Sequence, residues 1–314
     1  METDKILVIG SSGQFGSILT KSLQEKFGVN NVVATDINEN SQFNGHFEIL
    51  DALDYDAIFD IVVRNEITQI YHLAAILSAK GESDPLRTWE ININSFLNVL
   101  NVSVKLKIQK VFFPSSIAVF GPIIGRKCAF QSSILTPITV YGVSKVAGEN
   151  WSNYYFEKYG LDIRSIRFPG IIGYQSLPGG GTTDYAIDIF HKAINGEKFE
   201  CFLNENTSLP MIYMDDAIRA TIELMDAPPE NISIRTSYNL GGPSFSPLEL
   251  VSCIQKIFPE FEVIYKPDFR QEIANSWPKS INDSNASDDW NWKPKYYLEE
   301  IVDDMINNLK VKCI

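Results

Sequence analysis

Tyr141 and Lys145 stand four residues apart in the stretch TVYGVSKVAGENW, residues 139–151. On a helix this spacing places both side chains on one face. A free tyrosine hydroxyl titrates at about 10 and is a weak base at neutral pH, but a neighbouring ammonium favours its phenolate form. The pair therefore predicts a tyrosine that acts as acid or base with help from the lysine. The same spacing is common on ordinary amphipathic helices, so this prediction depends on the motifs around it.

Three glycines near the N-terminus provide such a motif. Gly10, Gly13 and Gly16 directly follow the apolar run KILVI and open a segment of helical periodicity. Glycines at a strand-to-helix turn allow a tight turn, close approach of the backbone to a pyrophosphate and close packing of the helix, whose first N–H groups face the phosphate. The spacing differs by one residue from Gly-x-Gly-x-x-Gly. We predict a dinucleotide-binding loop; the alternative is a glycine-rich turn without a ligand.

Asp36 indicates which dinucleotide this loop prefers. It ends the apolar run NVVATD, twenty residues after Gly16. An acidic residue there accepts hydrogen bonds from the adenosine ribose, and its charge repels a 2′-phosphate. We therefore predict NAD rather than NADP. The positive nicotinamide ring of NAD+ would further favour the Tyr141 phenolate.

A serine pair ends another apolar run, in FFPSSIAVFG. In parallel sheets, sites lie at the carboxyl ends of strands, so Ser115 or Ser116 is placed to donate a hydrogen bond to a substrate oxygen. The alternative is that these hydroxyls cap the end of the strand.

Alternating strands and helices must position these residues. Runs rich in Val, Ile and Phe recur at KILVIG, NVVATD, QIYHLAA, KVFFPSS and IRSIRFPG, and segments of helical periodicity such as 88–105 and 140–159 lie between them. This alternation predicts an α/β protein whose doubly wound parallel sheet, a Rossmann fold, spans residues 1–170. We expect a helix and a strand in about 209–242 to return to this NAD-binding domain. Residues 171–208 and 243–314 would form a smaller α/β substrate-binding lobe.

Composition excludes several classes of function. The 314 residues carry 27 basic and 39 acidic side chains, and this net charge of −12 disfavours nucleic acid and anionic membranes as partners. No apolar run is long enough for a membrane span, and a strand that begins by Lys5 leaves no room for a signal or transit peptide. Cysteines 128, 201, 253 and 313 fit no metal-site spacing, so we expect free thiols and no metal. The expected location is cytoplasmic, or the mitochondrial matrix in a eukaryote.

Taken in order along the chain, the motifs resemble those of the extended short-chain dehydrogenases/reductases. The shared motifs are the three glycines, HLAA from His72, NINS from Asn92, the serine pair, the Tyr–Lys pair and RFPGIIG. The resemblance implies hydride transfer to or from NAD with Tyr141 as acid/base. It implies that Lys145 holds the nicotinamide ribose and that Ser116, with Ser115 as the fallback, polarises the reacting oxygen. The cofactor residues implied are Gly10, Gly13, Gln14, Phe15, Gly16, Asp36, Ile37, Asp51, Ala52, Leu73, Ala74, Ala75, Asn92, Ser115, Tyr141, Lys145, Pro169 and Ile171.

The segment LPMIYMDD, residues 209–216, narrows the resemblance. Relatives that act on nucleotide-diphosphate sugars usually carry a segment similar to Arg-Asp-Phe-Val-His-Val-Asp-Asp there, and this chain departs from it. Stretches such as LAAILSAKGESDP, RFPGIIGYQSLPGGGTTDYAIDIF and PDFRQEIANSWP instead resemble the short-chain type of L-threonine 3-dehydrogenase. That branch implies oxidation of the 3-hydroxyl of L-threonine to 2-amino-3-oxobutyrate. A partner, 2-amino-3-ketobutyrate CoA ligase, would cleave this product to glycine and acetyl-CoA.

Two other functions stay open at this point. One is a nucleotide-sugar epimerase or dehydratase of the same fold. The other is a non-catalytic NAD-binding regulator, although such proteins usually lose the tyrosine or the lysine. The resemblance also implies a homodimer whose four-helix interface is formed by segments 88–105 and 140–159. The apolar faces of these segments could equally pack inside one subunit.

The glycine-rich stretch LPGGGTTDYAIDIF, residues 177–190, is the predicted substrate loop. Backbone amides and threonine hydroxyls suit the carboxylate of an amino acid, and a carboxylate suits its ammonium. Asp184 would bind the ammonium or cap the helix that starts there. Trp277 would be a pocket wall or, like Trp290 and Trp292, a core residue of the smaller lobe. The predicted substrate residues are Ser78, Ser116, Tyr141, Gly181, Thr182, Thr183, Asp184 and Trp277.

Overall fold

Strands and helices alternate along the first half of the chain, as the periodicity predicts. The computed structural model describes residues 4–40, 43–175, 177, 179 and 181–312. The strands are β1 (Ile6–Ile9), β2 (Val32–Asp36), β3 (His46–Ile49), β4 (Gln69–His72), β5 (Lys110–Ser116), β6 (Cys128–Ala129), β7 (Asp162–Phe168), β8 (Gly170–Ile172), β9 (Phe199–Cys201), β10 (Leu209–Tyr213), β11 (Tyr238–Asn239), β12 (Ser244–Phe245), β13 (Val263–Tyr265) and β14 (Ser280–Ile281). The α-helices are α1 (Gln14–Phe27), α2 (Tyr55–Arg64), α3 (Ser78–Gly81), α4 (Pro85–Trp89), α5 (Ser95–Leu106), α6 (Val140–Tyr159), α7 (Tyr185–Ile194), α8 (Met214–Asp226), α9 (Pro247–Gln255), α10 (Arg270–Ser276), α11 (Ser284–Trp290) and α12 (Leu298–Lys312).

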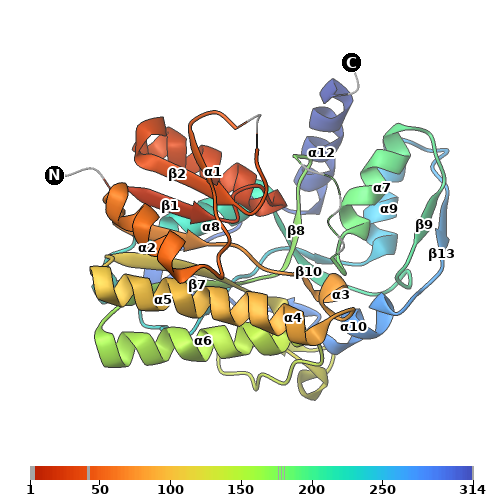
Figure 1. Cartoon of the computed structure of the whole chain (residues 1–314). Helices are drawn as coiled ribbons and strands as arrows, with labels where there is room; N and C mark the ends of the chain where they lie inside the picture. The colour runs from red at the N-terminus through yellow and green to blue at the C-terminus, as the bar shows by residue number, and fades with distance from the viewer. Residues whose placement is uncertain (1–3, 41–42, 176, 178, 180, 313–314) are drawn as a thin grey trace.

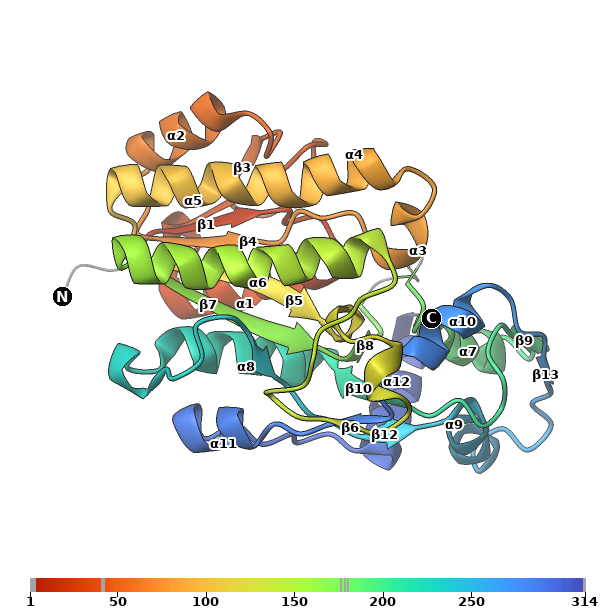
Figure 2. The ribbon, with the colours of Figure 1, turned by 90° about the horizontal axis from the view of Figure 1, so that it is seen from below.

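Seven strands form the main sheet in the order β11-β7-β5-β4-β1-β2-β3. All pairings within it are parallel, and β1 lies between β2 and β4. Helices α2, α5 and α6 cover one face of this sheet, and α1 and α8 cover the other (Figures 1 and 2). The predicted doubly wound Rossmann fold is confirmed. Because the strand order reverses beside β1, the carboxyl ends of β1 and β4 border the crevice where such sheets bind ligands.

The alternation of side chains along β1 explains why its apolar run is continuous. Ile6 and Val8 pack into the core beneath α1 and α8, whereas Leu7 and Ile9 pack into the core beneath α2 and α5. Successive residues of a strand face opposite sides, and here helices cover both sides. An unbroken apolar run is therefore what a central strand of this sheet requires.

The helix and strand expected to return to the main sheet are confirmed. Helix α8 packs against α1, and β11 pairs with β7 and forms one edge of the sheet. Strand β3 was not predicted from the sequence. It pairs with β2 at the other edge, and its residues His46–Ile49 are exposed or only partly buried, so they lack the apolar signal of the central strands.

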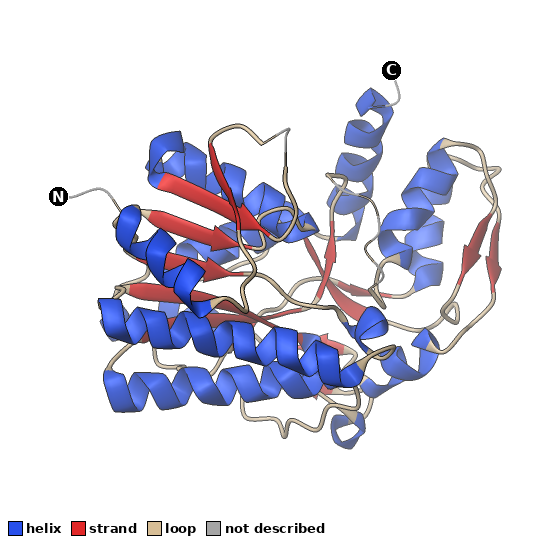
Figure 3. Ribbon diagram, viewed as in Figure 1, coloured by secondary structure: helices blue, strands red, loops and turns tan. Residues whose placement is uncertain are grey.

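A smaller lobe is built around α7, α9 and α12, with the short sheet β13-β9 at its outer edge (Figure 3). Trp277 lies in the core of this lobe. Trp290 and Trp292 do not: they pack in the core beneath α1 and α8, on the side of the main sheet. The prediction that these two tryptophans are core residues of the smaller lobe is therefore wrong. The chain returns to the large domain at α11. The domain boundaries themselves stay a prediction.

The two long helices predicted from periodicity differ in their regularity. Helix α6 spans residues 140–159, as predicted. The segment 88–105 is instead divided into α4, a π-helical turn at Glu90–Asn94, and α5. Within the described ranges, no helix has both the length and the apolar character needed to cross a membrane. Cys128, Cys201 and Cys253 are free thiols, and Cys313 lies outside the described residues.

Candidate active site

Tyr141 and Ser116 meet at the carboxyl end of β5. Tyr141 lies in the first turn of α6, which Thr139 caps by accepting a hydrogen bond from the Gly142 amide at 3.1 Å. Ser116 ends β5, and its hydroxyl hydrogen-bonds to the hydroxyl of Tyr141. A Cβ on Gly142 would lie 2.2 Å from the carbonyl oxygen of Ala118. The glycine after Tyr141 thus lets α6 approach the turn that follows Ser116.

Ser115 points away from this hydrogen bond. Its hydroxyl donates to Oε1 of Glu149 at 2.6 Å, and Glu149 lies two turns further along α6 than Tyr141. Consecutive residues of a strand face opposite ways, so the two serines cannot play the same part. The geometry favours Ser116 over Ser115 as the serine beside the reacting oxygen.

Lys145 is buried one turn after Tyr141 on α6. Its Nζ donates to the carbonyl oxygen of Pro114 at 2.7 Å and lies 5.4 Å from the centre of the Tyr141 ring. Burial lowers the pKa of Lys145 to about 7, although the nearby Glu149 carboxylate acts in the opposite direction. Burial also raises the pKa of Tyr141 to about 12, against the effect of the hydrogen bond from Ser116. Because burial opposes both charges, phenolate and ammonium stabilise one another strongly when they form together.

The glycine loop has the geometry of a pyrophosphate cradle. Gly10 has φ +89°, and a Cβ there would lie 2.7 Å from the amide nitrogen of Ala74. A Cβ on Gly16 would lie 2.2 Å from the carbonyl oxygen of Gly10. Gly13 has only one atom within 4 Å of its would-be Cβ, at 3.7 Å, and it caps α1 without a side chain. The first N–H groups of α1 are therefore left for a ligand, which fits a dinucleotide.

Asp36 lies beside this cradle at the carboxyl end of β2. One carboxylate oxygen accepts a hydrogen bond from the amide of Ser12 at 3.0 Å and the other from the amide of Ile37 at 2.8 Å. These contacts orient the carboxylate next to the glycine loop and leave lone pairs for ribose hydroxyls. Asp51, in the turn after β3, accepts a hydrogen bond from the amide of Leu53 at 2.9 Å. Ala52 beside it is buried.

Asn92 holds the loop that follows β4. It lies in the π-helical turn, and its side chain accepts from the Ile76 amide at 2.8 Å and donates to the Ile76 carbonyl at 3.1 Å. It also donates to the hydroxyl of Ser144 on α6 at 3.2 Å. Leu73 continues the pairing of β4 with β1 through its amide. Asn92 thus fixes residues 73–77 against α6, and a direct contact of its side chain with the cofactor stays a prediction.

The other implied cofactor residues border the same crevice. Phe15 at the start of α1 packs on Phe168 at the end of β7, with ring centroids 5.2 Å apart. Pro169 and Ile171 follow directly, between β7 and β8 and within β8. Gln14 donates a hydrogen bond to the carbonyl oxygen of Leu177. The cofactor loop and the predicted substrate loop are therefore in contact.

Thr182 of the substrate loop has a buried hydroxyl that a ligand could satisfy. It is 1% exposed, and its hydroxyl has no hydrogen-bond partner within the part of the chain that the structure describes. A buried hydroxyl without a partner is costly. The methyl group of Thr183 packs on Gly170, where a Cβ would lie 2.6 Å away. Pro178 and Gly180 lie outside the described residues.

The remaining predicted substrate residues, Asp184, Ser78 and Trp277, have other structural surroundings. Asp184 accepts a hydrogen bond from the Gly181 amide at 2.8 Å and makes no side-chain cap on α7. It therefore closes the loop rather than capping the helix. Ser78 is buried at the start of α3, and Trp277 is buried in the core of the smaller lobe. Substrate contacts of these three residues stay predictions.

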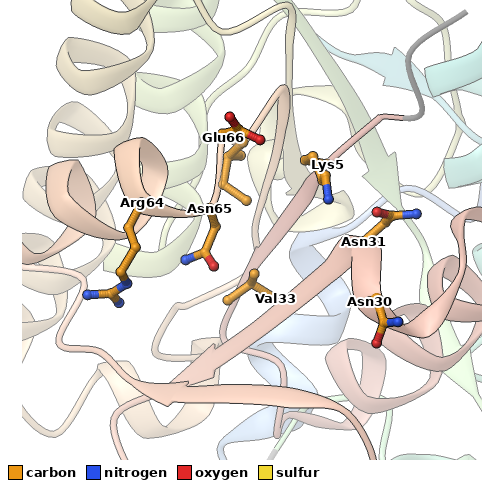
Figure 4. A pocket seen from close by; sticks show the side chains of 8 residues that line it. Lys5, Asn30, Asn31, Val33, Arg64, Asn65 and Glu66 are labelled. Carbon is orange, nitrogen blue, oxygen red and sulfur yellow. The ribbon is translucent and has the colours of Figure 1, made fainter.

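A pocket elsewhere on the main sheet is separate from these residues. It lies at the amino ends of β1 and β2, opposite the edge where Tyr141 and the glycine loop lie (Figure 4). None of the predicted site residues lines it. Its lining residues are Lys5, Asn30, Asn31, Val33, Arg64, Asn65, Glu66 and Ile67.

Known proteins match the chain over nearly its whole length. Residues 6–241 match the profile described as "NAD dependent epimerase/dehydratase family". The chain belongs to this family. NAD, the predicted cofactor, is thus confirmed at the level of the family, and the glycine cradle and Asp36 fit it.

Several members of the family have names that specify a substrate. Over 310 residues the chain is 44% identical to "L-threonine 3-dehydrogenase, mitochondrial" of Bos taurus, which covers 98% of this chain and 83% of the relative. The solved holo form of an L-threonine dehydrogenase from Cupriavidus necator is 48% identical, with a TM-score of 0.96 over 97% of this chain and 99% of that one. A UDP-glucose 4-epimerase from Thermotoga maritima, 22% identical with a TM-score of 0.88 over 99% and 100% of the two chains, shows the fold alone.

Proposed function

We propose that this protein is an NAD-dependent L-threonine 3-dehydrogenase, which oxidises the 3-hydroxyl of L-threonine to 2-amino-3-oxobutyrate. The observation that carries the proposal is similarity at 44–49% identity to proteins named L-threonine dehydrogenases, over nearly the whole chain. The paired hydroxyls of Ser116 and Tyr141, beside a cradle that fits NAD, support oxidation of an alcohol at this site.

The residues of this chain handle the proton of that reaction. Bound NAD+ supplies the acceptor for the hydride from C3 and a positive charge beside the site. The Tyr141 phenolate accepts the proton of the 3-hydroxyl at its oxygen as the C3 carbonyl forms. Ser116 donates a hydrogen bond that holds the reacting oxygen, and the Lys145 ammonium stabilises the phenolate before the proton arrives.

Recognition of the amino acid would fall to the substrate loop. The buried hydroxyl of Thr182 and nearby backbone amides are suited to the carboxylate, and Asp184 is suited to the ammonium. Ser78 would approach the same ligand from the cofactor side. Trp277 would act from behind the pocket, since it is buried in the core of the smaller lobe.

An assay of NADH formation tests the proposal. L-Threonine should reduce NAD+, whereas D-threonine, L-serine and a panel of UDP-sugars should give far lower rates. Absence of L-threonine-dependent reduction by folded, NAD-binding protein would reject the proposal. Conversion of a UDP-sugar without net NADH would instead favour the epimerase alternative.

The finer partners and the location are also proposals. We infer a homodimer through α5 and α6, which lie side by side at the surface (Figure 2). Val143, Trp151 and Tyr154 of α6 are 36–44% exposed there. Sedimentation at micromolar concentration should give twice the mass of the chain. A 2-amino-3-ketobutyrate CoA ligase is the proposed functional partner, and cell fractionation would separate a cytoplasmic from a mitochondrial location.

A further inference from the structure

A buried ion pair lies behind the Tyr141–Lys145 pair. Arg167 of β7 donates to Glu149 of α6 twice, from Nη2 to Oε2 at 2.7 Å and from Nε to Oε1 at 2.9 Å. The side chains are 4% and 2% exposed. Removing two charges from water is costly, and an apolar pair of similar volume is often as stable. Stability alone is therefore a weak reason for this pair, and no step of the proposed reaction uses it.

The pair connects α6 to three strands at the carboxyl edge of the sheet. Ser115, Arg167 and Asn239 are register partners in β5, β7 and β11, so they form one row across the sheet. Ser115 donates to Oε1 of Glu149 at 2.6 Å, and Arg167 donates through Nη1 to Oδ1 of Asn239 at 3.0 Å. The Glu149 carboxylate is thus the point where the helix is joined to this row.

The same helix is joined to β5 at Lys145, one turn earlier. Lys145 bonds to the carbonyl of Pro114, and Glu149 bonds to the hydroxyl of the next residue, Ser115. The residue after that is Ser116, the partner of Tyr141. Two contacts one helical turn apart therefore fix how far α6 lies along β5, and with it the separation of Tyr141 and Ser116.

We propose that Glu149 and Arg167 are positioning residues for the dehydrogenase reaction, which hold α6 at the register on β5 that places Tyr141, Lys145 and Ser116 for proton transfer. The inference rests on the proposed function. Neither side chain contacts the substrate in this arrangement. The charged and titratable groups that face Lys145 are Tyr141 and Glu149 on its own helix and His72 on β4, with Arg167 of β7 behind Glu149. Among them, the Glu149 carboxylate favours the ammonium, as the Tyr141 phenolate does once it has formed.

Glu149→Gln tests this role because it removes the charge and keeps the size and an acceptor for Ser115. We expect kcat for L-threonine to fall by about tenfold to hundredfold, as small displacements of catalytic groups do. The rising limb of kcat against pH should move to higher pH, since Lys145 holds its proton less well and Tyr141 is then harder to deprotonate. The KM for NAD should stay near the wild-type value.

Asp162→Asn is the matched control. Asp162 pairs with the buried Arg164 at 2.8 Å on the same strand, at the end of β7 remote from the site. Its loss should lower Tm and leave the pH profile of kcat unchanged. If Glu149→Gln does not fold, the double variant Glu149→Met/Arg167→Met should, because it removes the buried carboxylate and its guanidinium partner together.

The double variant also decides whether the pair is only structural. A folded double variant should still show a lowered kcat, and its rising limb of kcat against pH should still lie at higher pH than in the wild type. Wild-type values for both would overturn the proposal. Titration of tyrosinate absorbance in the NADH complex, with Tyr141→Phe as the blank, tests it without substrate. An unchanged Tyr141 titration in Glu149→Gln rejects this inference, whereas failure of the wild type to oxidise L-threonine rejects the proposed function.

Discussion

The hydroxyl of Ser116 hydrogen-bonds to the hydroxyl of Tyr141. Ser115, the residue before it, donates instead to Glu149 at 2.6 Å. Ser116→Ala should therefore lower kcat by about a hundredfold, the effect of losing one donor to a developing charge. Ser115→Ala should lower Tm and should reduce kcat much less than Ser116→Ala does. Steady-state kinetics with thermal unfolding of both variants check this, and a larger kcat loss in Ser115→Ala would reverse the assignment.

Tyr141→Phe should remove turnover and leave NADH binding nearly intact. Loss of a general acid/base group costs about 10²–10⁴ in rate, and the ring that packs in the site is retained. Tyr155→Phe on the same helix is the control, because its hydroxyl donates to Asn101 at 2.8 Å, away from the site. Assays of NADH formation and fluorescence titration with NADH measure the two effects. Turnover retained by Tyr141→Phe would exclude the tyrosine as the acid/base.

Thr182→Ala should raise the KM for L-threonine by about tenfold, since one hydrogen bond to a charged group is lost. The KM for NAD should change little. Thr182→Ser keeps the hydroxyl and should behave like the wild type. Equal increases in both KM values would show that the buried hydroxyl serves the loop rather than the substrate.

Wild-type protein should bind NADH more tightly than NADPH, because the charge of Asp36 repels a 2′-phosphate. Asp36→Asn keeps an acceptor for the Ser12 amide, which now bonds to the carboxylate at 3.0 Å. This variant should narrow the preference, mainly through tighter NADPH binding. Fluorescence titration with both cofactors is the measurement, and tighter binding of NADPH by the wild type contradicts the prediction.

His72 should make the protein less stable in acid. Burial, and next the charge of Lys145, lower its pKa from 6.5 to about 3. Between these values the unfolded chain binds a proton that the folded chain does not, so the free energy of unfolding falls as the pH falls. In urea unfolding over this range, the slope of the free energy of unfolding against pH should include uptake of about one proton by His72. His72→Gln should reduce this slope. An unchanged slope in the variant would assign the acid sensitivity to other groups.

The large-scale fold was predictable because its signals are local. Continuous apolar runs such as that of β1 report burial on both faces, and the Thr139 cap and Gly160 mark the ends of α6. Strand β3 was missed because an edge strand with exposed residues carries no such pattern. The π-helical turn was missed because Glu90–Asn94 lies at the start of the periodic segment 88–105, where too few residues precede it to show a change of helical face.

The site was predictable in its motifs and less so in its supports. The glycines, Tyr141 and Lys145 have a fixed spacing in the sequence. The Glu149–Arg167 pair joins residues 18 positions apart, and only the fold brings them together. A signal was nevertheless present: Arg167 interrupts an apolar run, and Glu149 follows Lys145 by one helical turn. A charge inside a buried strand requires a partner, and a search for that partner would have found it.

The π-helical turn at Glu90–Asn94 makes the helix less regular but places Asn92 against the loop that follows β4. Its single extra residue rotates the faces of α4 and α5 by about 100° relative to a continuous helix. Deleting one residue there would give a more regular helix and turn Asn92 away from Ile76. The side chain of Asn92 now hydrogen-bonds to both the amide and the carbonyl of Ile76. Substitutions that favour a straight helix would therefore act against the loop that borders the cofactor crevice. Thermostability engineering of this helix should keep the extra residue in place.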